Sequence, residues 1–78
     1  LDIENNCLFR LEKGLFDSNV QLVRLNLAKN VLKTLKSYNF NNLIKLKYLN
    51  LSYNSINLIE NNTFSGLISV EKIRLEYN

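Results

Sequence analysis

The feature that most constrains the fold is a nine-residue pattern that returns every 24 residues. The sequence reads LVRLNLAKN at residues 22–30, LKYLNLSYN at 46–54 and VEKIRLEYN at 70–78. Each segment carries aliphatic residues at its first, fourth and sixth positions and ends on asparagine. A fixed period of this length is typical of a solenoid, in which each unit forms one coil of the chain.

The alignment of the units extends over the whole sequence without a gap. The aliphatic columns are Leu22, Leu46, Val70; Leu1, Leu25, Leu49, Ile73; Ile3, Leu27, Leu51, Leu75; Leu8, Leu32, Ile56; and Leu11, Leu35, Ile59. Two more columns are asparagine (Asn6, Asn30, Asn54, Asn78) and phenylalanine (Phe16, Phe40, Phe64). The final column holds Leu43 and Leu67, and Asn19 takes this place in the first unit, which predicts a local irregularity there.

Each nine-residue segment contains a short alternation of the kind found in a strand with one buried face. Leu25 and Leu27 alternate with polar or small residues, and the same pattern recurs in the next units. One strand cannot bury such a face alone, but units stacked side by side can bury it continuously. We therefore expect strands over 22–28, 46–52 and 70–76 to pair in parallel.

The asparagine and phenylalanine columns are expected to play different structural roles inside the coil. Asparagine offers both a donor and an acceptor, so a column of asparagines can satisfy buried backbone groups in the turns above and below. Leaving such a group unpaired costs about 1–3 kcal/mol. The phenylalanine column predicts an apolar spine beneath the convex side.

The pattern L-x-x-L-x-L-x-x-N-x-L, followed by x-x-L-x-x-x-x-F-x-x-L, resembles the leucine-rich repeat family. The late Phe and the Leu three residues after it resemble the "typical" 24-residue class of animal extracellular proteins, such as Toll-like receptors, Slit-type proteins and matrix proteoglycans. The resemblance implies an α/β solenoid. This is a right-handed coil with short parallel strands on the concave face and loops or 3₁₀ turns on the convex face.

The repeat also predicts how the chain is organised. Residues 1–78 divide into a partial repeat (1–21), two complete repeats (22–45 and 46–69) and the start of a further repeat (70–78). The resemblance implies terminal caps, usually with several cysteines in extracellular members, and no such cap is recognisable. We therefore expect the sequence to be a segment of a longer array.

Composition argues against catalysis. The chain has no histidine and a single cysteine, Cys7, so neither a thiol–imidazole pair nor a Cys/His zinc site can form. Its two glycines, Gly14 and Gly66, are too few for a phosphate-binding loop. We expect no enzymatic activity, no catalytic or metal site, no cofactor and no small-molecule substrate. No apolar run is long enough to cross a membrane, so this segment is not expected to insert into one.

Residues that point away from the core on the strands form the candidate binding face. Tyr and Arg are enriched at interaction hot spots, which favours binding of a protein ligand or receptor. The candidate partner-binding residues are Arg24, Asn26, Lys29, Tyr48, Asn50, Tyr53, Lys72, Arg74 and Tyr77. The same face is expected to display Asp2, Glu4, Asn5, Ala28, Ser52 and Glu76.

Two alternatives to protein recognition follow from the charge pattern and from the repeat. The net charge is +3, and no acidic residue lies between Asp17 and Glu60, so the basic stretch 24–47 could bind a polyanion such as a glycosaminoglycan or nucleic acid. Arg24, Lys29 and Lys47 would form that patch. Alternatively, the segment is an architectural spacer and other repeats bind.

Two triplets fit the N-glycosylation pattern, beginning at Asn50 and at Asn61. Asn61 is expected on an outer loop, whereas a glycan on Asn50 would obstruct the concave face. Because the family resemblance is to extracellular proteins, we expect an extracellular or cell-surface location, with an intracellular one as the alternative.

Overall fold

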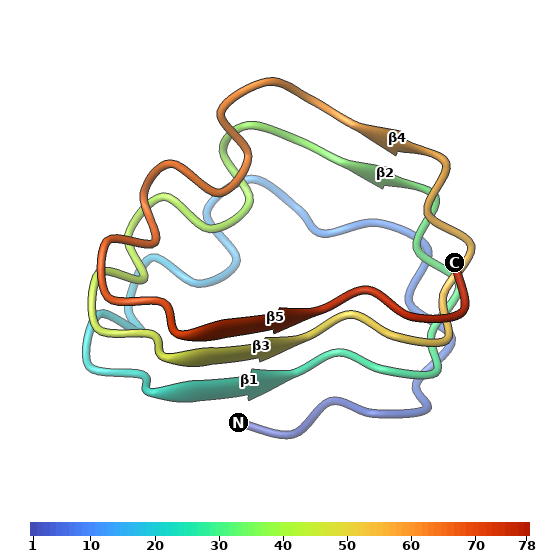
Figure 1. Ribbon diagram of the computed structural model, residues 1–78, viewed down its shortest axis with the longest axis horizontal. Helices are drawn as coiled ribbons and strands as arrows, with labels where there is room; N and C mark the ends of the chain where they lie inside the picture. The colour runs from blue at the N-terminus through green and yellow to red at the C-terminus, as the bar shows by residue number, and fades with distance from the viewer.

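The computed structural model describes all residues 1–78 and forms a coil whose successive units lie side by side (Figure 1). It contains five strands and no helix. The strands are β1 (Arg24–Asn26), β2 (Thr34–Leu35), β3 (Tyr48–Asn50), β4 (Leu58–Ile59) and β5 (Lys72–Arg74).

Strands β1, β3 and β5 form one parallel sheet in that order. The register is offset by one repeat, so that Leu25 pairs with Leu49 and Leu49 with Ile73. Equivalent hydrogen bonds recur along the coil: the amide of Leu27 donates to the carbonyl of Asn50, and that of Leu51 to Arg74, both at 2.8 Å. The expected solenoid of parallel strands is therefore confirmed. We call the outward-facing side of this sheet the concave face.

The opposite side of the coil, here called the convex side, consists of turns, extended segments and a second small sheet. β2 pairs with β4 in parallel, and both run opposite to the strands of the first sheet (Figure 1). The convex residues fold into turns rather than into 3₁₀ helix. The sequence pattern did not predict these two strands, because two residues are too few to show an alternation.

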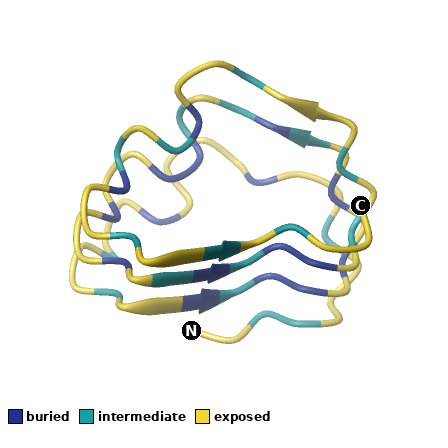
Figure 2. Cartoon of the chain, in the orientation of Figure 1, coloured by how far each residue is buried: buried dark blue, intermediate teal, exposed yellow.

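A continuous aliphatic core separates the two sheets. In β1 and β3 the central leucine is buried and its neighbours are not, which is the alternation expected of a half-buried strand (Figure 2). The twelve buried core residues are Leu11, Phe16, Leu25, Leu27, Leu32, Leu35, Phe40, Leu43, Leu46, Leu49, Leu51 and Leu67. Each fully buried leucine contributes about 1.5–3 kcal/mol through removal from water.

The phenylalanine column forms a stack through this core. The ring centroids of Phe16 and Phe40 lie 6.4 Å apart, and those of Phe40 and Phe64 lie 6.0 Å apart. The rings are tilted by only 14° and 15°. Phe40, in the middle, is completely buried, whereas Phe64 is half-buried.

The asparagine column lies at the turns that follow the concave strands. The Asn54 side-chain amide donates to the carbonyls of Leu51 and Ser52 in its own turn and to that of Leu27 in the preceding unit. Its oxygen accepts the amide of Leu32, also in the preceding unit. Asn30 and Asn78 repeat this arrangement, and Asn6 bonds only to its own turn. Each side chain from Asn30 onward thus satisfies backbone groups of its own turn and of the preceding unit, and none reaches forward to the following unit.

The predicted irregularity at Asn19 is also wrong. The amide of Asn19 donates to Phe16 and its carbonyl accepts from Leu22, as Leu43 does with Phe40 and Leu46 in the next unit. This turn is held by backbone hydrogen bonds, which do not depend on the side chain. Asn19 is half-buried and its side chain is tolerated there.

Two residues expected on the concave face are buried instead. Ala28 and Ser52 are only 3% and 2% exposed. The side-chain oxygen of the asparagine two positions earlier, Asn26 or Asn50, accepts the backbone amide of each at 3.0 Å. The asparagine side chain therefore folds back over the strand end and leaves the small residue covered.

One convex position links the first two units through a side chain. Asn39 is buried; its amide donates to the carbonyl of Leu11 at 3.1 Å and its oxygen accepts the amide of Lys36 at 2.7 Å. In the next unit the backbone makes this connection directly, from the amide of Glu60 to the carbonyl of Leu35. Asn39 therefore replaces a backbone hydrogen bond between residues 11 and 36.

Candidate functional site

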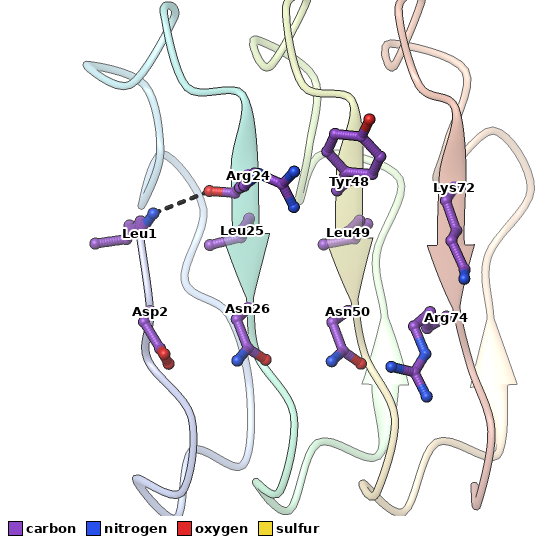
Figure 3. A pocket seen from close by; sticks show the side chains of 10 residues that line it. All are labelled: Leu1, Asp2, Arg24, Leu25, Asn26, Tyr48, Leu49, Asn50, Lys72 and Arg74. Atoms are coloured by element: carbon purple, nitrogen blue, oxygen red, sulfur yellow. Dashed lines mark hydrogen bonds between the residues drawn. The ribbon is translucent and has the colours of Figure 1, made fainter.

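The concave face carries an open hollow of about 570 Å³ that crosses all three strands of its sheet (Figure 3). Its side chains lie in two rows perpendicular to the strands, because the parallel register places equivalent residues side by side. The upper row in Figure 3 is Arg24, Tyr48 and Lys72, and the lower row is Asp2, Asn26, Asn50 and Arg74.

The upper row is built around an aromatic ring. The Arg24 guanidinium carbon lies 4.1 Å from the centroid of the Tyr48 ring, a cation–π contact. The Tyr48 hydroxyl donates to a carboxylate oxygen of Glu71 at 3.3 Å, and Glu71 also pairs with Lys47 at 3.9 Å. The ring is therefore fixed from two directions, while Lys72 on the neighbouring strand has no partner in the chain.

The lower row has a structural role that the sequence analysis missed. Asp2, Asn26 and Asn50 each accept the backbone amide two residues later, at 2.9–3.0 Å. This local bond ends the strand as an Asx turn does. The signal was present in the sequence as an Asp or Asn recurring two residues before a turn. The fourth member, Arg74, instead pairs with Glu76 at 2.8 Å through both Nε and Nη2.

A third set of exposed side chains lies where the strands lead into the asparagine turns. Asn5, Lys29, Tyr53 and Tyr77 occupy one column of the repeat, and all have positive φ, between 56° and 61°. This left-handed conformation is uncommon for residues other than glycine and asparagine and costs roughly 1–2 kcal/mol for each of Lys29, Tyr53 and Tyr77. The Tyr53 and Tyr77 rings stack with centroids 4.5 Å apart, and they remain 47% and 71% exposed.

The predicted partner-binding residues thus divide into two groups. Arg24, Asn26, Tyr48, Asn50, Lys72 and Arg74 line the hollow together. Lys29, Tyr53 and Tyr77 do not line it and lie in the column of positive φ at the ends of the strands.

The basic stretch is not gathered into one patch. Lys29 pairs with Glu4 at 3.2 Å and Lys36 with Glu60 at 3.4 Å, each across two neighbouring units. Lys47 pairs with Glu71 in the same way, and Lys45 donates to Gln21. The acidic residues missing from 24–47 therefore come from the preceding and following units, which lie beside this stretch in the coil.

The two possible glycosylation sites differ in their surroundings. Asn61 is exposed in the convex turn, and the buried hydroxyl of Thr63 donates to the carbonyl of Glu60 at 2.6 Å. Asn50 is half-buried in the hollow, and its oxygen accepts both the hydroxyl and the amide of Ser52. A glycan on Asn50 would lie against the lower row of the hollow.

Other kinds of site are not evident in the fold. Cys7 is a free, exposed thiol. No group of three His, Cys, Asp or Glu side chains is arranged to hold a metal ion. The chain has no helix of the length and apolarity that a membrane span requires.

Comparison with known proteins supports the assignment that the repeat suggests. No curated protein matches the sequence significantly. The family model described as leucine rich repeat matches residues 21–78, which include all five strands, both sheets and two of the three stacked phenylalanines. The chain belongs to the leucine-rich repeat family.

Proposed function

We propose that this chain is a protein-recognition module that binds its partner through the concave face. Leucine-rich repeats commonly bind protein partners and are typically not enzymes. The concave face is rigid because each strand is held by its neighbours at a fixed register. Its outward-pointing side chains are free of the core, so they are available for contacts with a partner.

The observation that carries this proposal is the exposed Tyr53–Tyr77 pair. Two large aromatic rings stack at the surface on backbone in a conformation that is uncommon for tyrosine, so neither burial nor backbone preference accounts for their presence. Tyrosine supplies a large contact area with little loss of conformational entropy on binding. Together with Tyr48 in the hollow, the pair gives the face three aromatic anchors.

The proposal can be tested by selecting binders from a random-peptide display library against the folded chain. The affinity of the selected peptides would then be measured by calorimetry for variants whose fold has been checked by circular dichroism. Tyr48→Ala and Tyr53→Ala are expected to weaken binding about tenfold or more, as at interaction hot spots. Phe9→Ala, which removes an exposed ring from the convex side, is the matched control. Binders that depend on Phe9 and ignore both tyrosines would contradict the proposal.

Two other roles remain as alternatives to be separated by the same measurements. A polyanion partner would lose affinity steeply as salt is added. The ion pairs formed by Lys29, Lys36 and Lys47 count against that role, because carboxylates of the neighbouring units already match half of the positive charges in the basic stretch. An architectural spacer would yield no binder that depends on the concave face.

We also propose an extracellular or cell-surface location within a longer repeat array, with Asn61 rather than Asn50 as the glycosylated residue. The exposure of Asn61 supports this choice. Labelling of intact expressing cells with a membrane-impermeant amine reagent tests the location. The glycosylation site is tested by gel mobility: a shift that is sensitive to glycosidase should be present in the unchanged protein and absent in Asn61→Gln. Protection of the protein from labelling would contradict the location.

A further inference from the structure

About half of the positive charges of this chain are matched by carboxylates. Five of the ten Lys and Arg residues form ion pairs with carboxylates. Lys45 donates to Gln21, and Lys13 lies over the Tyr38 ring. The residues left without a carboxylate or hydrogen-bond partner for their charged groups are Lys13, Arg24, Lys33 and Lys72.

Two of these four unmatched cations, Arg24 and Lys72, lie in the same row of the hollow. The register aligns Arg24 with Tyr48 and Tyr48 with Lys72, so the two cations flank one aromatic ring (Figure 3). Their backbones are two strands apart, about 9.6 Å. The contact with Tyr48 already orders the Arg24 guanidinium and leaves its N–H groups free for a bidentate bond to a carboxylate.

The lower row adds donors that also lack acceptors. The Asn50 amide nitrogen has no hydrogen-bond partner, although the Asn50 oxygen is used by Ser52. Arg74 bonds Glu76 through Nε and Nη2 and keeps its other terminal nitrogen free. The only carboxylate lining the hollow is that of Asp2 in the first unit, whose backbone pairs with Asn26 of β1 at the edge of the sheet.

We propose that the hollow binds an acidic segment of a protein partner, with one carboxylate between Arg24 and Lys72 and a second on Arg74 and Asn50. The two rows are two residues apart along the strands, about 6.8 Å. Acidic residues at positions i and i+2 of an extended segment have the same spacing, so a Glu-x-Glu segment lying parallel to the strands reaches both rows. This inference rests on the proposed function and specifies the ligand of the same face.

A peptide fits this face better than a continuous polyanion does. Glu4, Glu71 and Glu76 surround the hollow, and Asp2 lies within it. A glycosaminoglycan or nucleic acid chain extending beyond the hollow would meet these carboxylates. A protein segment can place acidic residues only where the cations are and neutral or basic ones elsewhere.

The test uses a fluorescein-labelled ten-residue peptide with three Glu residues at alternate positions and a matched peptide with Gln in their place. Fluorescence anisotropy would give the affinity for the folded chain, for the double variant R24Q/K72Q and for K33Q. The double variant is expected to weaken binding of the Glu peptide about tenfold or more, and the Gln peptide should bind the unchanged protein about tenfold more weakly. K33Q removes one equally unmatched charge from the convex side and is expected to change the affinity less than about twofold.

Changes in the NMR shifts of the backbone amides on adding the Glu peptide would show where it binds, and the largest changes are expected in β1, β3 and β5. If K33Q weakened binding as much as R24Q/K72Q does, the attraction would be diffuse and the inference overturned. Tighter binding of a heparin octasaccharide that depends on Arg24 and Lys72 would assign the hollow to a polyanion instead.

If the library binders need Tyr48 and Tyr53 but are neutral and are unaffected by R24Q/K72Q, this inference fails while the proposed function stands. The proposed function would fail as well only if no library binder depended on the concave face.

Discussion

The side-chain oxygen of Asn30 accepts the backbone amide of Leu8, 22 residues earlier in the chain, at 2.9 Å. The same bond joins Asn54 to Leu32 and Asn78 to Ile56, both at 3.1 Å. Leu8 and Leu32 begin the return segments that lead to the convex side. Each asparagine therefore fastens its own turn to the start of the return segment in the preceding unit.

Replacing Asn30 with alanine should destabilise the fold more than replacing any exposed asparagine. The Asn30 side chain makes five hydrogen bonds, two as acceptor and three as donor. Alanine would leave the backbone amides of Asn6 and Leu8 without a partner in the chain, whereas each of the three carbonyls keeps another donor. We expect a loss of about 2–4 kcal/mol in the free energy of unfolding. Urea denaturation followed by circular dichroism would measure it.

The control for this prediction is Asn57→Ala, because Asn57 is exposed on the convex side. Its substitution is expected to change stability by less than about 0.5 kcal/mol. Asn30→Asp keeps the acceptor but turns a carboxylate toward three carbonyls, so it should be at least as harmful as alanine. Near-native stability of Asn30→Asp would show that the donated hydrogen bonds matter little.

Removal of the central ring of the phenylalanine stack should be costly. Phe40 is fully buried between Phe16 and Phe64, so Phe40→Ala is expected to lower the free energy of unfolding by about 3–5 kcal/mol. Phe64→Ala should cost less, because Phe64 is only half-buried. The urea midpoints of both variants test this order, and equal losses would contradict it.

Gly66 is required because a side chain there would collide with the preceding unit. A Cβ atom at this position would lie 2.7 Å from the carbonyl oxygen of Asn41, which is backbone and cannot rotate away. Gly66→Ala should therefore destabilise the fold by about 1–3 kcal/mol. Ser69→Ala, at a nearby exposed position, is the control. Thermal unfolding would measure both, and an unchanged midpoint for Gly66→Ala would show that the two units separate easily.

The stability of the fold should depend on the charge of Glu60. The backbone amide of Ser37 donates to one Glu60 carboxylate oxygen at 2.8 Å, and with the nearby Lys36 ammonium it holds the pKa of Glu60 below its ordinary value of 4.5, against the opposing effect of burial. The unfolded chain therefore takes up this proton at a higher pH than the folded chain. The stabilisation is fully present above pH 4.5 and is lost as the pH falls through the lowered pKa.

Urea midpoints for the unchanged protein and for Glu60→Gln, measured from pH 7 to pH 3, would test this dependence. The variant is expected to be less stable at pH 7, and the difference should shrink as the pH falls below 4.5. A difference that stays constant over the whole range would mean that the Glu60 charge does not contribute.

The fold was predictable because the repeat imposes one answer on every unit. Leu25, Leu49 and Ile73 could only be buried together if strands one repeat apart paired in parallel, and this pairing is observed. The two-residue strands β2 and β4 were not predictable, because their pairing depends on how closely the convex segments approach after the core has packed. For the same reason nothing in the sequence marked Asn39 as a link to Leu11.

The candidate site was predictable in part. The alternation in Arg24-Leu25-Asn26 identified which side chains face outward, and these residues do line the hollow. Burial of Ala28 and Ser52 was missed because it depends on a bond from a neighbouring side chain, which alternation does not describe. The ion pairs were missed because their members are 24 or 25 residues apart and become neighbours only in the coil.

The backward reach of the asparagines bears on how such a chain can be lengthened or shortened. Because each asparagine links its own turn to the one before it, a duplicated or excised 24-residue block would leave every surviving link with an equivalent partner. An insertion of one or two residues would instead misalign the turns, the strands and the stacked rings together. Protein engineers can therefore treat the complete repeat as the smallest exchangeable part of this molecule.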